Sequence, residues 1–288
     1  MSLGARIAAV LGTRVVGLCP LQGGDLSTVT RADLADGRQV VAKTGPRARR
    51  EARMLRAMAA AGAAVPRLLH AGADLLILDH VPPLAADAAG WRMLGQELAR
   101  MHRAGGAGLD AGAGTGAGAG DDDGGPPAGR YGWPEDDAFG AQAIANRPDD
   151  DWPRFWARNR LLPFTAHLDA RLARRIETLS ARLPERLPAA PAPALLHGDL
   201  WVGNVIFARP RPVLIDPACY RGDAEVDLAM LALFGTPPAA FAAGYGPLPP
   251  GHAERRPIYQ LWPALVHLRL FGAGYLGLVE GLLARCGV

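Results

Sequence analysis

The sequence has few cysteines and no long apolar run, and each shortage excludes a class of protein. Cys19, Cys219 and Cys286 are its three cysteines, and none belongs to a CxxC pair. Neither a disulfide framework nor a cysteine zinc site is therefore indicated. No run of 18 apolar residues could span a membrane, and the apolar N-terminal run is too short for a convincing signal peptide. We therefore expect a cytoplasmic protein with no membrane partner.

Excess charge of one sign is also absent. The 288 residues carry a formal net charge of +3, with 49% hydrophobic and 20% charged residues, a balance typical of a globular enzyme with a sizeable core. Disorder throughout is thereby excluded. Five arginines between Arg47 and Arg56 could suggest nucleic acid, but no aromatic residue lies among them, and such runs are usually solvated helix faces. No nucleic-acid partner is expected.

One segment cannot contribute to a core. Residues 104–129 consist mostly of glycine, alanine and aspartate, which predicts a flexible Gly/Asp-rich insert. Its consecutive aspartates, Asp121 to Asp123, are more typical of solvated carboxylates than of a metal site. The whole chain divides into an N-lobe of about residues 1–79, which we expect to bind nucleotide, and a C-lobe of about residues 80–288, which contains the insert and which we expect to be catalytic and to bind substrate.

The chemistry is concentrated between Leu195 and Gly235. His197, Asp199 and Asn204 follow the order and spacing of the kinase catalytic loop H-R-D-L-x-x-x-N. One loop can then present a carboxylate to an acceptor hydroxyl and an amide oxygen to Mg²⁺. Asp216 follows the apolar run Pro212 to Ile215, which is typical of a buried strand that delivers a second metal ligand to the edge of a site. Because several of these spacings match the kinase signature at once, ordinary polar turn residues are a poor alternative interpretation of the four residues.

The N-lobe supplies the expected nucleotide contacts. Gly23 and Gly24 lie between predicted strands 14–21 and 27–34 and could let backbone N–H groups approach phosphates, although a plain hairpin turn is the alternative. Lys43 ends the next strand, in the manner of the V-A-I-K lysine. Glu51, on a predicted helix over 48–61, would pair with Lys43 or else be a solvated residue.

Further elements connect these motifs. Strands at 65–69 and 75–78 lead to a hinge in which the backbone of Asp79 and Val81 could bind an adenine edge. The spacing of Trp91, Leu94, Leu98 and Met101 predicts a helix, and that of Leu168 to Leu183 predicts a second helix that Pro184 ends. Asp223 could cap a helix that ends near Gly235, and residues 239–245 and 258–283 should also be helical.

Two stretches of this region resemble a known family. The text HGDLWVGN, followed by IDPACYRGDAEVDLAM, resembles the fructosamine kinase, or ketosamine-3-kinase, family, a branch of the aminoglycoside-phosphotransferase-like kinases. The family usually has Ser where this chain has Val202 and Arg where it has Ala224; neither change removes a catalytic group. Ala143 and Ile144 also stand where the family tends to have Pro-Gln, in the segment between its C-lobe helices.

This resemblance implies an α+β, two-lobed protein-kinase-like fold with a small, mainly β N-lobe and a larger, mainly helical C-lobe. It implies ATP and Mg²⁺ as cofactors and a small-molecule or protein-bound ketosamine as the substrate, phosphorylated on its sugar 3-hydroxyl. Asp199 would be the base, Asn204 and Asp216 the metal ligands, and His197 and Asp227 supports of the catalytic loop. Trp201 would lie against the sugar adduct, with a core role as the alternative.

Two other functions remain open from the sequence. One is phosphorylation of an aminoglycoside or another small molecule by a kinase of the same superfamily. The other is a catalytically silent nucleotide-binding module, against which the intact set of Lys43, Asp199, Asn204 and Asp216 argues. The sugar, the source of the amine and the oligomeric state are not specified by any pattern in the chain.

Overall fold

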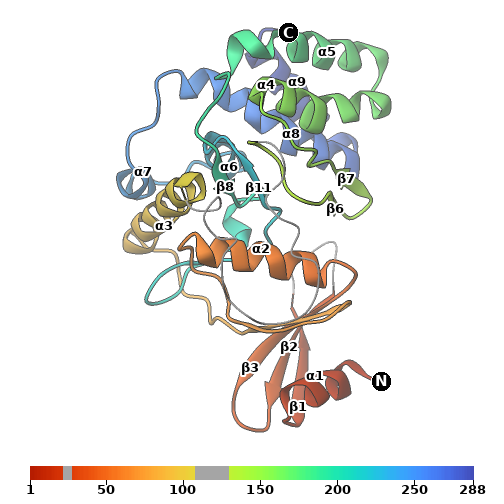
Figure 1. Ribbon diagram of the computed structural model, residues 1–288, viewed down its shortest axis with the longest axis vertical. Coiled ribbons are helices and arrows are strands. Elements are labelled where there is room, and N and C mark those ends of the chain that lie inside the picture. The colour runs from red at the N-terminus through yellow and green to blue at the C-terminus, as the bar shows by residue number, and fades with distance from the viewer. Residues whose placement is uncertain (22–27, 108–129) are drawn as a thin grey trace.

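A computed structural model of the protein describes residues 1–21, 28–107 and 130–288. A small β-rich lobe lies at one end of the molecule and a larger helical lobe at the other, with helix α2 (Ala48–Ala60) between them (Figure 1). The N- and C-termini lie at opposite ends of this elongated shape. The α+β arrangement expected from the sequence is therefore present.

The small lobe is built on one antiparallel sheet. Its strand order is β1-β2-β3-β5-β4. The strands are β1 (Val15–Pro20), β2 (Thr28–Leu34), β3 (Gln39–Thr44), β4 (Leu68–Ala71) and β5 (Leu75–Asp79). Gly37 closes the β2–β3 turn with a φ of 86°, a conformation that favours glycine over residues with a Cβ atom.

Alternation along the strands gives this sheet two apolar faces. Helix α1 (Leu3–Leu11) places Ile7 on one face, where it packs in a cluster with Val40 and Ile77. Leu76 and Leu78 point to the opposite face, which is covered by α2. The sheet is thus a middle layer between two helices.

Helix α2 has two buried sides rather than one. Ala52 and Leu55 pack against the sheet, whereas Met54 and Met58 belong to a cluster formed mainly by the helical lobe. Each side follows the helical repeat, so one helix is in van der Waals contact with both lobes. Its position therefore depends on both.

The helical lobe contains four longer helices around short strand pairs. The longer helices are α3 (Ala88–Ala107), α5 (Ala170–Arg186), α8 (His252–Phe271) and α9 (Leu276–Arg285). The shorter ones are α4 (Trp152–Trp156), η1 (Ala157–Leu161), η2 (Leu162–His167), η3 (Val202–Asn204), α6 (Glu225–Leu231), α7 (Ala239–Tyr245) and η4 (Ala273–Tyr275). The antiparallel strand pairs are β6 (Asp137–Phe139) with β7 (Gln142–Ile144), β8 (Ala194–Leu196) with β11 (Tyr220–Gly222), and β9 (Val205–Ile206) with β10 (Val213–Leu214). Over the described part of the chain, no helix combines the length and hydropathy needed to cross a bilayer.

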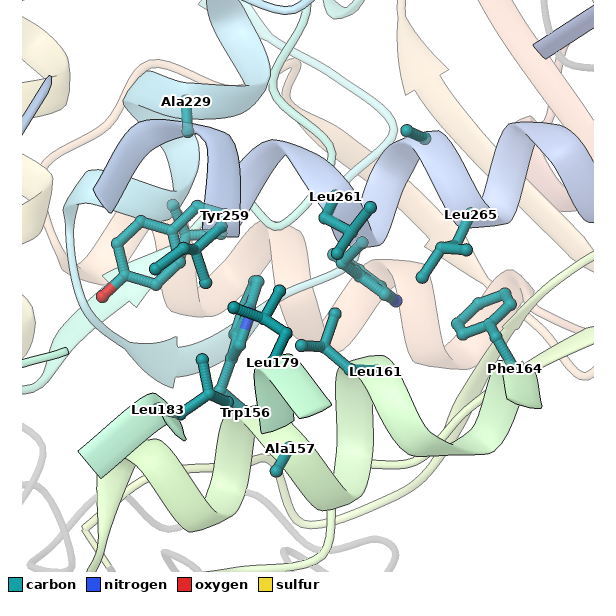
Figure 2. Close-up of a cluster of buried hydrophobic side chains, with 14 of the residues drawn as sticks. Trp156, Ala157, Leu161, Phe164, Leu179, Leu183, Ala229, Tyr259, Leu261 and Leu265 are labelled. Carbon is teal, nitrogen blue, oxygen red and sulfur yellow. The ribbon is translucent and has the colours of Figure 1, made fainter. Parts of the chain in front are cut away.

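The core of this lobe joins α8 to the α4–α5 region. Trp156, Leu179 and Tyr259 are among its fully buried side chains, and Figure 2 shows them packed between the two layers of helices. The Trp156 and Tyr259 rings meet edge to face with centroids 5.0 Å apart, an arrangement that aromatic pairs favour. This core fixes α8, which also lines the candidate site.

Two predicted helix ends were wrong. Helix α5 continues past Pro184 to Arg186, because the buried Leu183 and Leu187 flank the proline and the Leu187 N–H still bonds the Leu183 carbonyl at 2.9 Å. Proline in the last turn costs one backbone bond without ending the helix at once. Helix α6 ends at Leu231 rather than near Gly235, because the chain tightens into a turn in which the Leu233 N–H donates to the Met230 carbonyl.

Replacing Leu179 by alanine tests the importance of this core. Leu179 is fully buried on α5, and the cavity left by truncation should lower the free energy of unfolding by about 2–5 kcal/mol. Glu177→Ala, at an exposed position on the same helix, should change it by no more than about 0.5 kcal/mol. Denaturant titration of both variants measures the difference, and equal effects would contradict the packing described.

Candidate active site

The predicted catalytic loop lies between β8 and β9, and close backbone contacts fix its shape. Gly198 has a φ of 80°, and a Cβ atom there would lie 1.9 Å from the Ala218 carbonyl oxygen. Only glycine fits such a position. The Ala218 N–H in turn donates to the His197 carbonyl at 2.8 Å. The glycine of the HGD motif therefore lets the loop pack against the strand that follows Asp216.

Asp227 lies fully buried behind this loop and accepts three hydrogen bonds. The backbone N–H groups of His197 and Gly198 donate to its two carboxylate oxygens at 2.7 and 2.9 Å. His102 Nε2 lies 3.1 Å from the same carboxylate, and its Nδ1 lies 2.9 Å from the Tyr245 hydroxyl. Burial alone would raise the pKa of Asp227, but the His102 hydrogen bond and the other donors lower it overall. These contacts are those expected of a residue that supports the loop.

His197 links the loop to the segment that carries Asp216. Its Nε2 donates to the Ile215 carbonyl at 2.8 Å, and its Nδ1 accepts from the Asp199 N–H at 3.3 Å. Burial lowers the pKa of His197, so the ring is neutral, in agreement with one donating and one accepting nitrogen. A neutral imidazole thus sets the distance between the two segments.

Asp199 and Asn204 are neighbours on the catalytic loop. The Asn204 side-chain amide donates to the backbone carbonyl of Asp199 at 2.8 Å and to its carboxylate at 3.1 Å. Burial raises the pKa of Asp199 to about 6, while the Asn204 hydrogen bond and the charge of Arg47 act in the opposite direction. A carboxylate with a pKa near 6 can accept a proton at neutral pH. Because both amide hydrogens face Asp199, the amide oxygen of Asn204 is left as an acceptor.

Asp216 follows β10 in a left-handed backbone conformation. Its φ is 55°, the one positive φ of a non-glycine residue in the part of the chain that the structure describes. Such outliers are concentrated at functional sites, where surrounding contacts maintain them. The Ile215 N–H donates to the Asn204 carbonyl at 3.1 Å, so the segment carrying Asp216 is tied to the catalytic loop.

Lys43 connects the small lobe to this site. Its ammonium lies 2.6 Å from Glu51 on α2 and forms a direct ion pair with Asp216. Only 7% of the residue is exposed, and a buried cation is tolerated where carboxylates neutralise it. The pair between Lys43 and Glu51 is therefore present, and the alternative of a solvated Glu51 is excluded by its burial.

The residues around Asp216 fit a magnesium ion. Mg²⁺ is usually held by one or two carboxylates together with substrate phosphates rather than by a protein cage. Here the Asp216 carboxylate and the amide oxygen of Asn204 line the same cavity. Within the described ranges, no cluster of three or more His, Cys, Asp or Glu side chains forms a separate metal cage. The donor set thus suits a metal that arrives with a nucleotide.

The other predicted nucleotide contacts are only partly visible. Gly23 and Gly24 lie outside the described residues. At the hinge, the Asp79 N–H donates to the Arg67 carbonyl and its carboxylate pairs with the Arg67 side chain. The His80 N–H donates to Gln39. Those two N–H groups are thus committed to the sheet, and Val81 is the next residue whose backbone could meet an adenine edge.

Arg47, which precedes α2, and Arg50 and Arg53 of α2 have a role that the sequence pattern did not reveal. Arg47 forms a bidentate pair with the buried Asp137 of β6 at 2.5 and 3.0 Å. Arg50 and Arg53 both pair with Glu135. The arginine run is therefore not simply a solvated face, because these residues bind α2 to the helical lobe. The partners are far away in sequence, so only the folded chain brings them together.

A cavity of about 630 Å³ opens in front of the catalytic loop. Asp199, Asn204 and Asp216 line one end, and Trp201 lies beside them. Trp201 is 40% exposed, which excludes the alternative of a core residue. Its ring covers Gly203, where a Cβ atom would lie 2.3 Å from the indole, so glycine is needed for this ring position. Among the described residues, none of the five-stranded sheet lines the cavity, but Glu51 and Asp216, which pair with Lys43 of that sheet, do.

A buried guanidinium supports the rear of this cavity. Arg160 lies 4.1 Å from the ring centroid of Tyr220 and 4.7 Å from that of Trp262, which lines the cavity. Its side chain also donates to Asn146 at 2.8 Å. Burial lowers the pKa of Arg160, and cation–π contacts offset part of the cost of burying its charge.

Taken together, the fold and this site define a protein-kinase-like phosphotransferase. A model of the family described as fructosamine kinase matches residues 20–287, and the chain belongs to that family. The class and the family predicted from the HGDLWVGN and DLAM stretches are thereby confirmed.

Individual relatives agree with this assignment. A "probable ketoamine kinase" of Thermus thermophilus is 36% identical over 265 residues, which cover 90% of this chain and 89% of the relative. A crystal structure from Thermobifida fusca, provisionally named a fructosamine-3-kinase, superposes with a TM-score of 0.84 at 29% identity over 99% of this chain and 98% of that one. A macrolide 2′-phosphotransferase of Brachybacterium faecium has a TM-score of 0.62 at 22% identity, covering 96% of both chains, and shows the shared fold alone.

Substituting Asp227 by asparagine should destabilise the protein. The backbone N–H groups of His197 and Gly198 each donate to a carboxylate oxygen in the wild type, and in the variant one of them would face the amide NH₂, which cannot accept. We expect the free energy of unfolding to fall by about 3 kcal/mol at pH 7. The folded-state pKa of Asp227 is lowered below its ordinary value of 3.8, so its stabilisation is present above that pH and is lost as the pH falls through the folded pKa. The difference between wild type and Asp227→Asn should therefore shrink below about pH 4.

Urea titrations at pH 7 and under acidic conditions measure this difference. Glu185→Gln, which changes an exposed carboxylate of α5 in the same way, should match wild type at both. An Asp227→Asn protein as stable as wild type at pH 7 would contradict the supporting role.

Proposed function

We propose that this protein is an ATP-dependent kinase that phosphorylates the sugar 3-hydroxyl of ketosamines, the adducts of amines with sugars. Family membership supports a phosphotransferase. The single observation that carries the proposal is the placement of Asp199, Asn204 and Asp216 at one end of a cavity that is large enough for a small-molecule substrate.

Asp199 is the base in this proposal. It accepts the proton of the 3-hydroxyl as that oxygen attacks the γ-phosphorus and the bond to the departing ADP breaks. Its raised pKa suits a group that must be ionised at neutral pH and still basic enough to take a proton. Asp227 and His197 hold the loop that carries it. Trp201 lies against the sugar adduct.

The nucleotide side is assigned to the small lobe and to Asp216. When bound, MgATP supplies the phosphoryl group and neutralises charge that develops during transfer. Asp216 and Asn204 would hold the metal, and Lys43 would hold phosphate oxygens, with Glu51 fixing its position. Gly23 and Gly24 would cover the phosphates, and the backbone of Val81 would meet the adenine edge, because the Asp79 N–H already donates to the Arg67 carbonyl.

Charge in the cavity favours a ketosamine over an aminoglycoside. Aminoglycosides carry several ammonium groups and need many carboxylates for recognition. Among the described residues that line this cavity, the carboxylates are Glu51, Asp199 and Asp216, all at its catalytic end. Lys43 already neutralises Glu51 and Asp216. Phosphorylation at the 3-position would place a leaving group on the carbon next to the C2 carbonyl. Enolisation between C1 and C2 would then expel phosphate from C3 and leave an imine at C1, and hydrolysis of that imine by water would release the free amine, which is a deglycation reaction.

The test is ADP release with ribulosyl- or fructosyl-lysine, compared with a panel of aminoglycosides. We expect ketosamines alone to be turned over, and NMR of the product should place phosphate on the 3-oxygen. Well-folded protein that phosphorylates no ketosamine would refute the proposal. Binding of ATP and Mg²⁺ without any turnover would instead indicate a silent nucleotide-binding module.

A second test concerns Asp199 and pH. Protonated Asp199 cannot act as a base, so kcat/KM for the ketosamine should be constant above about pH 6 and fall about tenfold per pH unit below it. Asp199→Asn should lower kcat/KM by about 10²–10⁴-fold and remove this acid limb. Asp74→Asn, an exposed position on the small lobe, should behave as wild type. Persistent wild-type turnover in Asp199→Asn would overturn the assigned mechanism.

A further inference from the structure

The exposed aromatic side chains of the protein are gathered in one place. Among the Phe, Trp and Tyr residues of the described chain, the exposed ones are Trp201, Phe234 and Phe271, at 40%, 49% and 49%. All three line the cavity in front of Asp199. Exposed apolar surface is costly, and its concentration in a hollow marks a binding site. The catalytic steps assigned above involve neither Phe234 nor Phe271.

Phe234 and Phe271 belong to a continuous aromatic wall of the cavity. We define this wall as Phe234, His267, Phe271 and Tyr275. His267 lies at its centre, with ring centroids 4.9 Å from Phe234, 5.4 Å from Phe271 and 5.0 Å from Tyr275. The His267 Nδ1–H donates to the Pro263 carbonyl at 2.7 Å, which fixes its ring. The wall is therefore pre-organised by α8 and η4.

The wall carries no carboxylate, and among the described residues that line the cavity the acidic groups lie at the catalytic end. The basic Arg47 is also at that end and is neutralised by Asp137. A cationic group placed against the wall would therefore lose hydration without gaining a carboxylate partner among these residues. An uncharged flat or apolar group would instead gain burial and ring contacts.

Ketosamine chemistry places such a group there. Carbons C1 to C3 link the amine nitrogen to the reacting 3-hydroxyl. With the hydroxyl at Asp199 and the sugar against Trp201, the substituent on the nitrogen extends into the remaining part of the cavity. The aromatic wall lines that part of the cavity.

We propose that the aromatic wall is a specificity site for the amine substituent and selects ketosamines of aromatic or bulky apolar amines. This inference rests on the proposed function and deepens it. The preferred substrate is thus the sugar adduct of a small, uncharged arylalkyl group rather than of a polar amino acid.

The test compares fructosamines that share one sugar and differ in the amine. The series is 2-phenylethylamine, methylamine, glycine, lysine and a glycated carrier protein. We expect kcat/KM for the phenylethyl compound to exceed that for the methyl and glycine compounds by about tenfold or more. Calorimetric titration of the same compounds in the absence of ATP should give the same order of affinity.

Two single substitutions locate the effect. Phe234→Ala and Phe271→Ala should each raise KM for the phenylethyl compound by about tenfold, with kcat/KM for the methyl compound and KM for ATP unchanged within about twofold. Both side chains are half exposed, so truncation should leave the melting temperature close to that of wild type. Val10→Ala, an exposed apolar position on α1, is the matched control and should change none of these values.

Each outcome separates this inference from the proposed function. Equal kcat/KM for all amines would overturn the inference and leave the ketosamine kinase intact. The same conclusion follows if the glycated protein or the lysine compound is preferred over the phenylethyl compound, or if Phe234→Ala and Phe271→Ala lower activity equally for every amine. Absence of turnover with every fructosamine, while phenylethylamine adducts still bind in calorimetry, would overturn the proposed function but retain the wall as a binding site.

Discussion

The whole site depends on one buried ammonium. Lys43 comes from the sheet, Glu51 from α2 and Asp216 from the helical lobe. Lys43 and Glu51 are buried, whereas the Asp216 side chain is 32% exposed. Separating Lys43 from Glu51 would leave an uncompensated buried charge, which is far more costly than losing an exposed ion pair. Helix α2 is held on both sides, by packing of Ala52 and Leu55 against the sheet and of Met54 and Met58 against the helical lobe. The pair between Arg47 and Asp137 also ties it to the helical lobe.

Much of the fold follows from local patterns. The strands predicted at 14–21, 27–34 and 75–78 lie within a residue or so of β1, β2 and β5, and the spacing of Leu168 to Leu183 predicted most of α5. Helix ends were less predictable, because burial of Leu187 extended α5 beyond a proline. That burial depends on a neighbour distant in sequence, which no local pattern contains.

The candidate site divides in the same way. Asp199 and Asn204 could be predicted as neighbours because they share one short loop, so their spacing in the sequence determines how close they lie in the structure. The pairing of Arg47 with Asp137 could not, since 90 residues separate them and the arginine run looked solvated. The aromatic wall was also invisible, because Phe234 and Phe271 come from separate segments and resemble ordinary core residues until their exposure is known.

Lys43 is also the only lysine in the sequence, and all the other side chains that carry a permanent positive charge are arginines. Its amine is enclosed between two carboxylates, so the chain has no exposed ε-amino group. Reducing sugars form their adducts on amines, and arginine guanidinium groups stay protonated and offer no such nucleophile. A member of a family that acts on sugar adducts of amines thus has a surface whose positive charge is itself largely resistant to that modification.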